Sequence, residues 1–224
     1  LPAMTATLPE ALQERIGGMG VAMPFQLWSW VQYIGAPQAE MDAWRVRDIQ
    51  AELSAVAGMP VTVQNDATAA CGAELVFGSG EKPKDFLYFY FGTFIGGGLV
   101  LNGRLFPGRT GNAGGVGPMP VPGPDGGTRR LFDLASMSRL AEMMEEAGES
   151  SDHLWQQHRA WEVSRPILDA WIDGAAQGLA YAILSASALT ELEAVLIDGW
   201  MPAAIRTEIT RRTEAALDRL DMSG

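Results

Sequence analysis

Asn65 and Asp66 are the side chains of this sequence best placed to do chemistry. They follow an apolar run typical of a buried strand, Val61–Gln64, and precede a segment typical of a helix, residues 67–77. An aspartate at such a junction could accept the proton of a substrate hydroxyl during phosphoryl transfer. An aspartate directly before a helix is also a preferred N-cap residue, worth about 1 kcal/mol. Spacing alone favours the cap, and one side chain can fill both roles.

A glycine-rich stretch is the second candidate. An apolar run, Phe86–Phe91, ends at Gly92-Thr93, and a second run, residues 99–101, joins Gly96-Gly97-Gly98 to Asn102-Gly103. Asn-Gly between apolar runs predicts a hairpin, because both central residues of its turn need positive φ. Gly92-Thr93 and the three glycines would expose N–H groups beside a hydroxyl, which suits a phosphate. The same glycines could equally serve only tight turns.

These segments resemble the ROK family, which comprises sugar kinases and sugar-responsive transcriptional repressors. The similar blocks, in chain order, are Gly18–Pro24, Pro60–Ala70, Gly92–Arg104 and Gly111–Gly114. By this resemblance Asp66 matches the catalytic base of the kinases, and Asn65 matches the residue that hydrogen-bonds the sugar hydroxyls. The resemblance implies sugar binding by Asn65, Asp66, Gly114 and Gly115, and phosphate binding by Gly92 and Thr93.

The sequence departs from the family pattern where sugar ligands are expected. In the family a Glu and, three positions later, a His follow Ala-Gly, whereas this chain has Gly115 and Pro118. The zinc-binding cysteines of the family are replaced by a proline- and glycine-rich segment, residues 118–130, which we expect to lack regular structure. A further sugar-binding Glu would fall at Phe132, beside Asp133. We therefore expect no structural zinc. Each lost ligand should weaken sugar binding by about 1–3 kcal/mol, the usual cost of losing a buried hydrogen bond.

The family's nucleotide-side glycine run is also altered, because this chain has Asp198-Gly199-Trp200. Trp200 could fill the space of an adenine, or it could be the aromatic plug of a structural turn. Either role would weaken nucleotide binding. An aromatic segment, residues 25–37 with Trp28 and Trp30, could likewise cap a sugar or fill the core.

Composition limits the function further. A net charge of −11 with only two lysines is poorly suited to hold DNA, because Lys and Arg neutralise its phosphates. The single cysteine, Cys71, excludes an internal disulfide framework, and we expect it on a buried helix. His153 and His158 do not share a helix face, and we expect both at the surface. The longest apolar stretch, residues 175–189, is too polar to span a membrane, so we expect a cytoplasmic protein.

Alternating strands and helices indicate an α/β fold. The resemblance implies a ribonuclease H-like, actin/hexokinase-like fold of two lobes, with residues 1–66 and 205–224 in a small lobe and 67–204 in a large lobe. The family's opening hairpin with its Asp-x-Gly-Gly-Thr loop has no counterpart here, so we expect a small lobe that is N-terminally incomplete or covered by a partner chain. Further expected elements are helices at 8–16, 39–57, 131–147 and within 153–190, an amphipathic C-terminal helix, and strands at 19–23 and 194–197.

Two functions are consistent with these residues. The first is the effector-binding and dimerising body of a ROK-type transcriptional regulator, with a helix-turn-helix outside this chain and a sugar or sugar derivative as effector. It needs no cofactor and no membrane. The alternative is an ATP-dependent sugar kinase that uses ATP and Mg²⁺, with Asp66 as the base.

Overall fold

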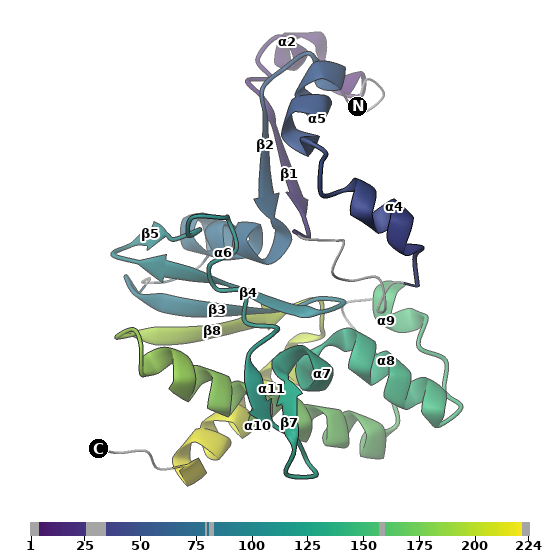
Figure 1. Ribbon diagram of the computed structural model, residues 1–224, viewed down its shortest axis with the longest axis vertical. Helices are drawn as coiled ribbons and strands as arrows, with labels where there is room; N and C mark the ends of the chain where they lie inside the picture. Colours follow the sequence, from purple (N-terminus) through teal and green to yellow (C-terminus); the bar gives the residue numbers. More distant parts are fainter. Residues whose placement is uncertain (1–4, 26–34, 79, 81–82, 157–159, 221–224) are drawn as a thin grey trace. The chain divides into compact units, whose positions relative to one another are not determined.

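The computed structural model describes residues 5–25, 35–78, 80, 83–156 and 160–220. The chain divides into two compact units, Leu1–Ala69 and Ala70–Gly224 (Figure 1). The boundary falls inside a helix, α6 (Asp66–Phe77), three residues beyond the expected end of the small lobe. Trp28, Trp30 and Tyr33 lie outside the described residues, so the aromatic capping role stays a prediction.

The first unit is built on a parallel pair of strands. β1 (Met19–Met23) pairs with β2 (Val61–Asn65) in register from Met19–Val61 to Met23–Asn65. Among its described residues are the helices α2 (Glu10–Gln13), α4 (Gln38–Ala43) and α5 (Ile49–Ala57).

The expectation of one continuous helix at 39–57 is wrong, because α4 and α5 are two separate helices. Asp48 interrupts it by capping the second helix: its carboxylate accepts a hydrogen bond from Ala51 N at 2.9 Å. Gly58, with φ of +65°, ends α5 in the left-handed conformation, as the Gly-Met-Pro stop signal predicts. The expected helix at 8–16 is likewise reduced to α2.

The second unit is built on a four-stranded sheet in the order β5-β4-β3-β8. β3 (Phe86–Phe91) lies in the middle, antiparallel to β4 (Ile95–Leu101) and parallel to β8 (Ala194–Gly199). The predicted hairpin turn is confirmed: Asn102 and Gly103 have φ of 54° and 69° and join β4 to β5 (Arg104–Leu105).

Helices cover both faces of this sheet, which explains why β3 is apolar at every position. The remaining elements are β6 (Pro120–Pro122), β7 (Thr128–Arg130), α7 (Leu131–Ala135), α8 (Met137–Glu146), α9 (His153–Gln156), α10 (Arg165–Ser187) and α11 (Ala203–Leu220). In Figure 1, α6 lies on one side of the sheet, and α7, α8, α10 and α11 lie on the other.

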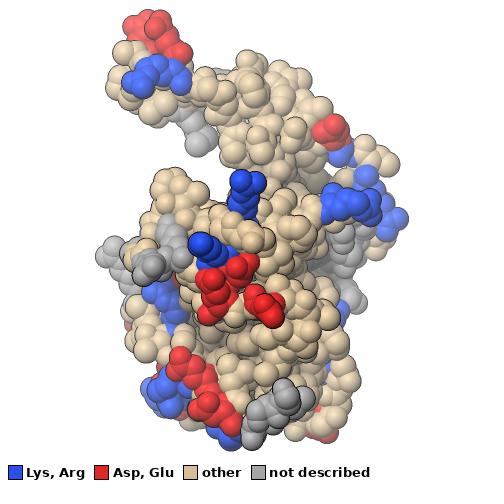
Figure 2. Space-filling model, turned by 90° about the vertical axis from the view of Figure 1, so that its left-hand side faces the viewer, with Lys and Arg blue, Asp and Glu red and all other residues tan. Residues whose placement is uncertain are grey.

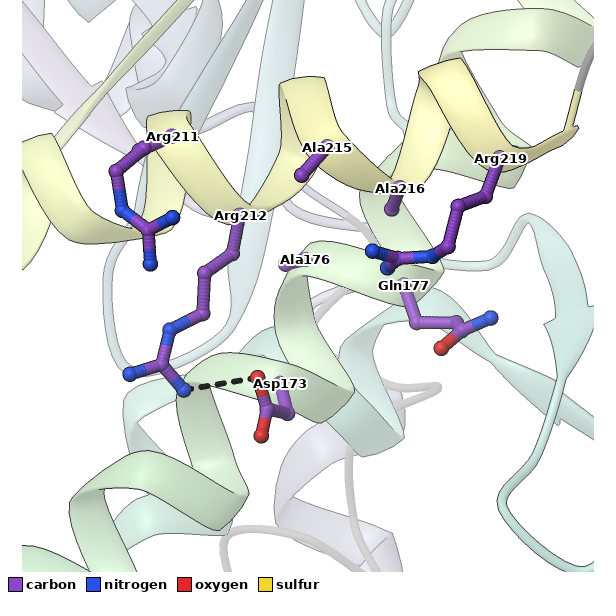
Figure 3. Close-up of a pocket in the computed structure, with 8 residues that line it drawn as sticks. All are labelled: Asp173, Ala176, Gln177, Arg211, Arg212, Ala215, Ala216 and Arg219. Atoms are coloured by element: carbon purple, nitrogen blue, oxygen red, sulfur yellow. Dashed lines mark hydrogen bonds and ion pairs between the residues drawn. The ribbon is translucent and has the colours of Figure 1, made fainter.

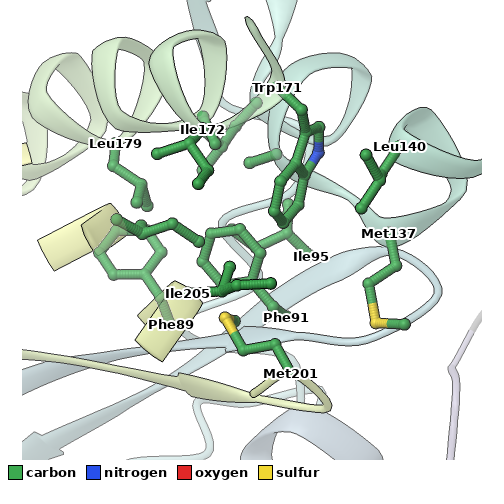
Figure 4. Packing of buried hydrophobic residues seen from close by; sticks show 14 of the residues in the cluster. Phe89, Phe91, Ile95, Met137, Leu140, Trp171, Ile172, Leu179, Met201 and Ile205 are labelled. Carbon is green, nitrogen blue, oxygen red and sulfur yellow. The ribbon is translucent and has the colours of Figure 1, made fainter. Parts of the chain in front are cut away.

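The main core lies between the sheet and α10. Phe89 and Phe91 are fully buried, and the Trp171 ring meets Phe91 edge-on with a centroid distance of 5.9 Å (Figure 4). The opposite face of β3 packs against Cys71 of α6, which is fully buried as expected. Burial raises the pKa of the Cys71 thiol to about 12.

The expected placement of residues 205–224 in the small lobe is wrong for the described part of that segment. Ile205 and Ile209 of α11 belong to the core of the second unit, and α11 packs along α10. Its predicted apolar stripe is real and covers α10. The Arg212 side chain is only 16% exposed, and it pairs with Asp169 and Asp173 of α10.

Two other segments differ from expectation. Residues 118–130 are not irregular throughout, because β6 and β7 form a short hairpin. Asp125 stabilises its turn by accepting a hydrogen bond from Gly127 N at 3.1 Å. The helix expected at 131–147 breaks at Ser136, which is extended, with φ of −77° and ψ of 151°.

Candidate functional site

The junction of β2 and α6 holds Asn65 and Asp66. Asn65 is the helix cap: its Oδ1 accepts hydrogen bonds from Thr68 N at 3.1 Å and from Thr68 Oγ1 at 3.3 Å. The expectation that Asp66 is the N-cap is therefore wrong, because the helix begins at Asp66 itself and the residue before it caps it.

Asp66 is consequently available for another role. It is exposed at the first position of α6, and its Oδ1 accepts a hydrogen bond from the adjacent Ala67 N at 2.9 Å. The positive end of the helix dipole favours a carboxylate at this position. A charged, exposed acceptor at the carboxyl end of a strand can hold a ligand hydroxyl or take its proton.

The Gly92-Thr93 turn is docked on the start of α8. The carbonyl oxygens of Gly92 and Thr93 accept hydrogen bonds from Met137 N at 3.2 Å and Ser138 N at 3.0 Å. The hydroxyl of Ser136, fully buried, accepts one from Ile95 N at 2.9 Å. The N–H groups of Gly92 and Thr93 donate no hydrogen bond to another described residue, and Thr93 is exposed. This side of the turn can receive an anion.

The three glycines at 96–98 do not form an anion-binding loop, which corrects the first expectation for them. They lie in β4, opposite Tyr90, Phe89 and Tyr88. Their role is close packing: a Cβ on Gly97 would lie 2.4 Å from Tyr88 O and 2.7 Å from Gly114 O.

Gly114 packs directly against the backbone of β4. Its φ is +79°, and a Cβ there would lie 2.7 Å from Gly98 Cα. β4 and the turn that contains Gly114 therefore touch backbone to backbone, which only glycine permits.

The neighbouring positions offer no polar side chain to a sugar. Gly115 is exposed, its N–H donates to Asn112 O at 3.2 Å, and a Cβ there would lie 3.1 Å from Asn112 O. A side chain at 115 thus requires a small shift of Asn112. Pro118 is exposed and lacks a side-chain donor or acceptor.

Asp133 lies beside Phe132, the position of the family's further sugar-binding Glu, and its carboxylate is already hydrogen-bonded within the chain. It accepts hydrogen bonds from Arg130 N and Nε and from Arg130 Nη2, each at 3.0 Å, and so caps α7. Phe132 packs edge-on against Phe94 at 5.9 Å, and the Arg130 guanidinium lies 4.1 Å above the Phe132 ring. Sequence reasoning missed Phe94 and Arg130, which both contact the Phe132 ring, because it did not predict the β6–β7 hairpin that ends at Arg130.

Trp200 is anchored at the end of β8. Its indole N–H donates to Leu154 O at 3.0 Å and its backbone N–H to Phe91 O at 2.8 Å, while 39% of the residue remains exposed. Gly199 has φ of +147°, and a Cβ there would lie 2.3 Å from Phe91 O. The structure thus gives Trp200 a structural anchor, and its effect on a nucleotide stays a prediction.

Asp198, beside this turn, is held between two elements. It accepts hydrogen bonds from the Tyr88 hydroxyl at 3.2 Å and from Arg206 at 2.5 Å. Burial, and secondarily the Asp198 charge, raise the pKa of Tyr88 well above its usual range, so the phenol stays protonated.

No three His, Cys, Asp or Glu side chains of the described residues gather closely enough to hold a metal ion. His153, expected at the surface, is half-buried and accepts a hydrogen bond from Glu162 N at 3.1 Å, whereas His158 lies outside the described residues. Within the described part of the chain, every helix is too short or too polar to cross a membrane.

Comparison with known proteins agrees with the family resemblance of the sequence. The family model of the ROK family matches residues 1–201. The bifunctional enzyme NanE/NanK of Brucella melitensis is 38% identical over 151 residues, which cover 66% of this chain and 28% of the relative. The chain therefore aligns with little more than a quarter of that protein's length.

Solved structures show the same fold in kinases and in a regulator. A ROK family glucokinase from Streptomyces griseus, in complex with glucose and AMPPNP, is 20% identical with a TM-score of 0.60, and the match covers 79% of this chain and 63% of that one. A ROK family transcriptional regulator, a homolog of the E. coli MLC protein, is 21% identical with a TM-score of 0.55, covering 76% and 47%. The fold is thus the actin/hexokinase-like fold of these proteins, and the chain belongs to the ROK family.

Proposed function

We propose that this chain is the sugar-binding and dimerising body of a ROK-type transcriptional regulator whose kinase site has lost substrate ligands. The observation that carries this proposal is the pair of positions 115 and 118. Gly115 and Pro118 stand where the kinases of the family have a carboxylate and an imidazole for the sugar. Asp133 does not replace them, because Arg130 engages both of its oxygens.

The remaining polar groups support binding rather than turnover. Asn65 and Asp66 would hold hydroxyls of a sugar or sugar derivative, and Gly114 and Gly115 would let the ligand approach the backbone. A sensor needs only a ligand that binds one of two conformations better than the other. It does not need a transition state to be stabilised.

DNA contact would come from a helix-turn-helix outside these 224 residues. The chain carries a net charge of −11. On the face shown in Figure 2, Lys and Arg lie in separate small groups rather than in one continuous basic surface. Such a surface is poorly suited to neutralise DNA phosphates. A cytoplasmic homodimer completes the proposal.

The kinase alternative rests on Asp66 and on the Gly92-Thr93 turn. Asp66 is exposed, and the N–H groups of Gly92 and Thr93 lack an acceptor among the described residues, which fits a phosphate. ATP with Mg²⁺ would supply the phosphoryl group and offset its charge. Gly199 supports a nucleotide site less well, because its close approach to Phe91 serves backbone packing.

Titration calorimetry on the full-length gene product tests sugar binding. Neutral hexoses, pentoses and N-acetyl amino sugars form the panel, and at least one should bind. Asn65→Ser should weaken that sugar about tenfold, because serine keeps the helix cap but loses the amide donors. Asp48→Asn, which changes a helix-capping carboxylate on α5, should leave the affinity unchanged. Absence of binding across the panel would refute the sensing role.

A coupled ADP-release assay with the same sugars, ATP and Mg²⁺ separates the two functions. We expect no sugar-dependent turnover above the level of the Asp66→Asn variant. Turnover that Asp66→Asn abolishes would establish the kinase instead. Light scattering should give the mass of a dimer, and a monomer at micromolar concentration would remove the dimerising part of the proposal.

A further inference from the structure

A polar groove between α10 and α11 lies within the second unit and has no role in the proposed function. Its volume is about 430 Å³, within the range of small-molecule pockets. It is lined by Asp173, Ala176, Gln177, Arg211, Arg212, Ala215, Ala216 and Arg219 (Figure 3). The alanines of the two helices leave the space open, and the arginines of α11 stand around it.

The lining is basic in an acidic chain. It holds three guanidinium groups and one carboxylate, whereas the chain as a whole carries a net charge of −11. Asp169 and Glu208 also pair with these arginines, so the charges of Arg211 and Arg212 are balanced, and Arg219 is the arginine of the lining whose charge no described acid offsets. An unpaired guanidinium attracts an anion by Coulomb interaction.

Two of the three arginines are held in place by acids. Arg212 donates to Glu208 at 2.7 Å, to Asp173 at 2.8 Å and to Asp169 at 2.5 Å, which raises its pKa. Arg211 donates to both oxygens of Glu208, at 2.7 and 2.9 Å. These bonds fix both guanidinium planes without a ligand, so little side-chain entropy remains to be lost on binding.

Arg219 differs from both. The residues three and four positions before it are Ala216 and Ala215, and it forms no ion pair with another described residue. In Figure 3 its guanidinium extends along the groove toward Gln177 of α10. Arg219 can therefore give its donors to a ligand, and Gln177 offers both an amide donor and an acceptor beside it.

We propose that this groove binds a small phosphate monoester. Arg219 forms the charge-assisted pair with the phosphate, and Gln177 hydrogen-bonds hydroxyls of the attached group. A guanidinium fork matches two oxygens of a phosphate or of a carboxylate at once, and the larger negative charge of a phosphate monoester favours it over a monovalent carboxylate. The volume exceeds what inorganic phosphate fills, which favours a phosphorylated polyol or sugar.

Titration calorimetry on the full chain with glucose 6-phosphate, inorganic phosphate and glucose tests the proposal. Glucose 6-phosphate should bind more tightly than inorganic phosphate, and glucose should add nothing at this groove. Arg219→Gln should weaken glucose 6-phosphate about tenfold or more, the usual cost of losing a charged hydrogen bond. Gln177→Ala should weaken glucose 6-phosphate and leave inorganic phosphate unchanged.

Two controls locate the binding. Arg15→Gln removes an exposed arginine of the first unit and should not change the affinity. Asp66→Asn should also leave it unchanged, which keeps this proposal independent of the sugar site. Absence of phosphate binding, equal losses in Arg15→Gln and Arg219→Gln, or loss in Asp66→Asn would overturn the assignment. Binding of poly-glutamate in preference to glucose 6-phosphate would overturn it in favour of an acidic protein partner.

Discussion

The β1–β2 sheet of the first unit and the four-stranded sheet of the second unit differ in how their strands are covered. In the second unit five of the six residues of β3 are buried. In the first unit β1 has no buried residue, and β2 has one, Val61. Apolar burial is the main stabilising contribution to folding. The strands of the second unit therefore contribute more of this stabilisation than those of the first. The β1–β2 sheet instead keeps a polar junction accessible at Asn65 and Asp66. The buried core of the second unit is thus separate from the junction at which Asn65 and Asp66 would meet a sugar.

The largest expected effect tests the buried side of this comparison. Trp171→Ala should lower the free energy of unfolding by about 4 kcal/mol, because the residue is 1% exposed and a cavity remains. It also leaves Ser136 O without the indole donor, which now lies 3.1 Å away. Urea unfolding followed by circular dichroism measures the change. Val63→Ala on half-buried β2 should cost only about 1 kcal/mol. Equal losses would break the comparison.

Backbone packing at β4 gives the next effect. Gly114→Ala should destabilise the protein by about 3 kcal/mol, because it combines a left-handed φ with a clash against Gly98. Gly126 is the matched control, since its φ is +78° and nothing lies within 4 Å of a Cβ there. Gly126→Ala should therefore show the conformational cost alone, about 1 kcal/mol. If both variants lose the same amount, the contact with β4 contributes nothing.

The helix cap at the polar junction should give a smaller effect. Asn65→Ala should lower the free energy of unfolding by about 1 kcal/mol, because the Thr68 N–H loses its acceptor. Asn65→Ser should restore most of this loss. Thermal unfolding of both variants measures the difference. A stable Asn65→Ala protein would show that Thr68 finds another acceptor.

Local patterns predicted those parts of the fold that depend on neighbours in sequence. β3 and the Asn102-Gly103 turn follow from an apolar run and from φ requirements within two residues. The amphipathic stripe of α11 was equally clear, but a stripe does not say which surface it covers. Its partner proved to be α10, and the expected return to the small lobe was wrong.

The candidate site was predicted less well, for a similar reason. Glycine at 96–98 signals a close approach, but the sequence does not say whether a ligand or another backbone approaches. Here it is Tyr88 O and the Gly114 turn. The cap moved from Asp66 to Asn65 because a boundary shift of one residue exchanges their roles.

The smallest expected effect concerns ion pairs in the two units. Hydrogen bonds from Arg211 and Arg212 lower the pKa of Glu208 from 4.5 to about 2. A pKa that is lower in the folded protein means that the ionised carboxylate stabilises it. This contribution is complete above pH 4.5 and is lost as the pH falls toward 2. Because these groups are solvent-accessible, screening keeps the contribution small. In the first unit Arg47 lowers the pKa of Glu52 in the same direction, chiefly by a side-chain hydrogen bond.

Urea midpoints measured from pH 6 downward, at low and high salt, separate the two units. Glu208→Gln should reduce the fall of the urea midpoint at acid pH more than Glu52→Gln does, because Glu208 shares the Arg212 guanidinium with Asp169 and Asp173 of α10 in one network. Among the described residues, the ion pair in the first unit joins Arg47 to Glu52 alone, and their side chains are 49% and 43% exposed. High salt should reduce the Glu52 contribution more than the Glu208 contribution, since a network with a 16%-exposed arginine is less accessible to counterions. The reverse order would show that the α10–α11 network has no stabilising advantage over an exposed pair.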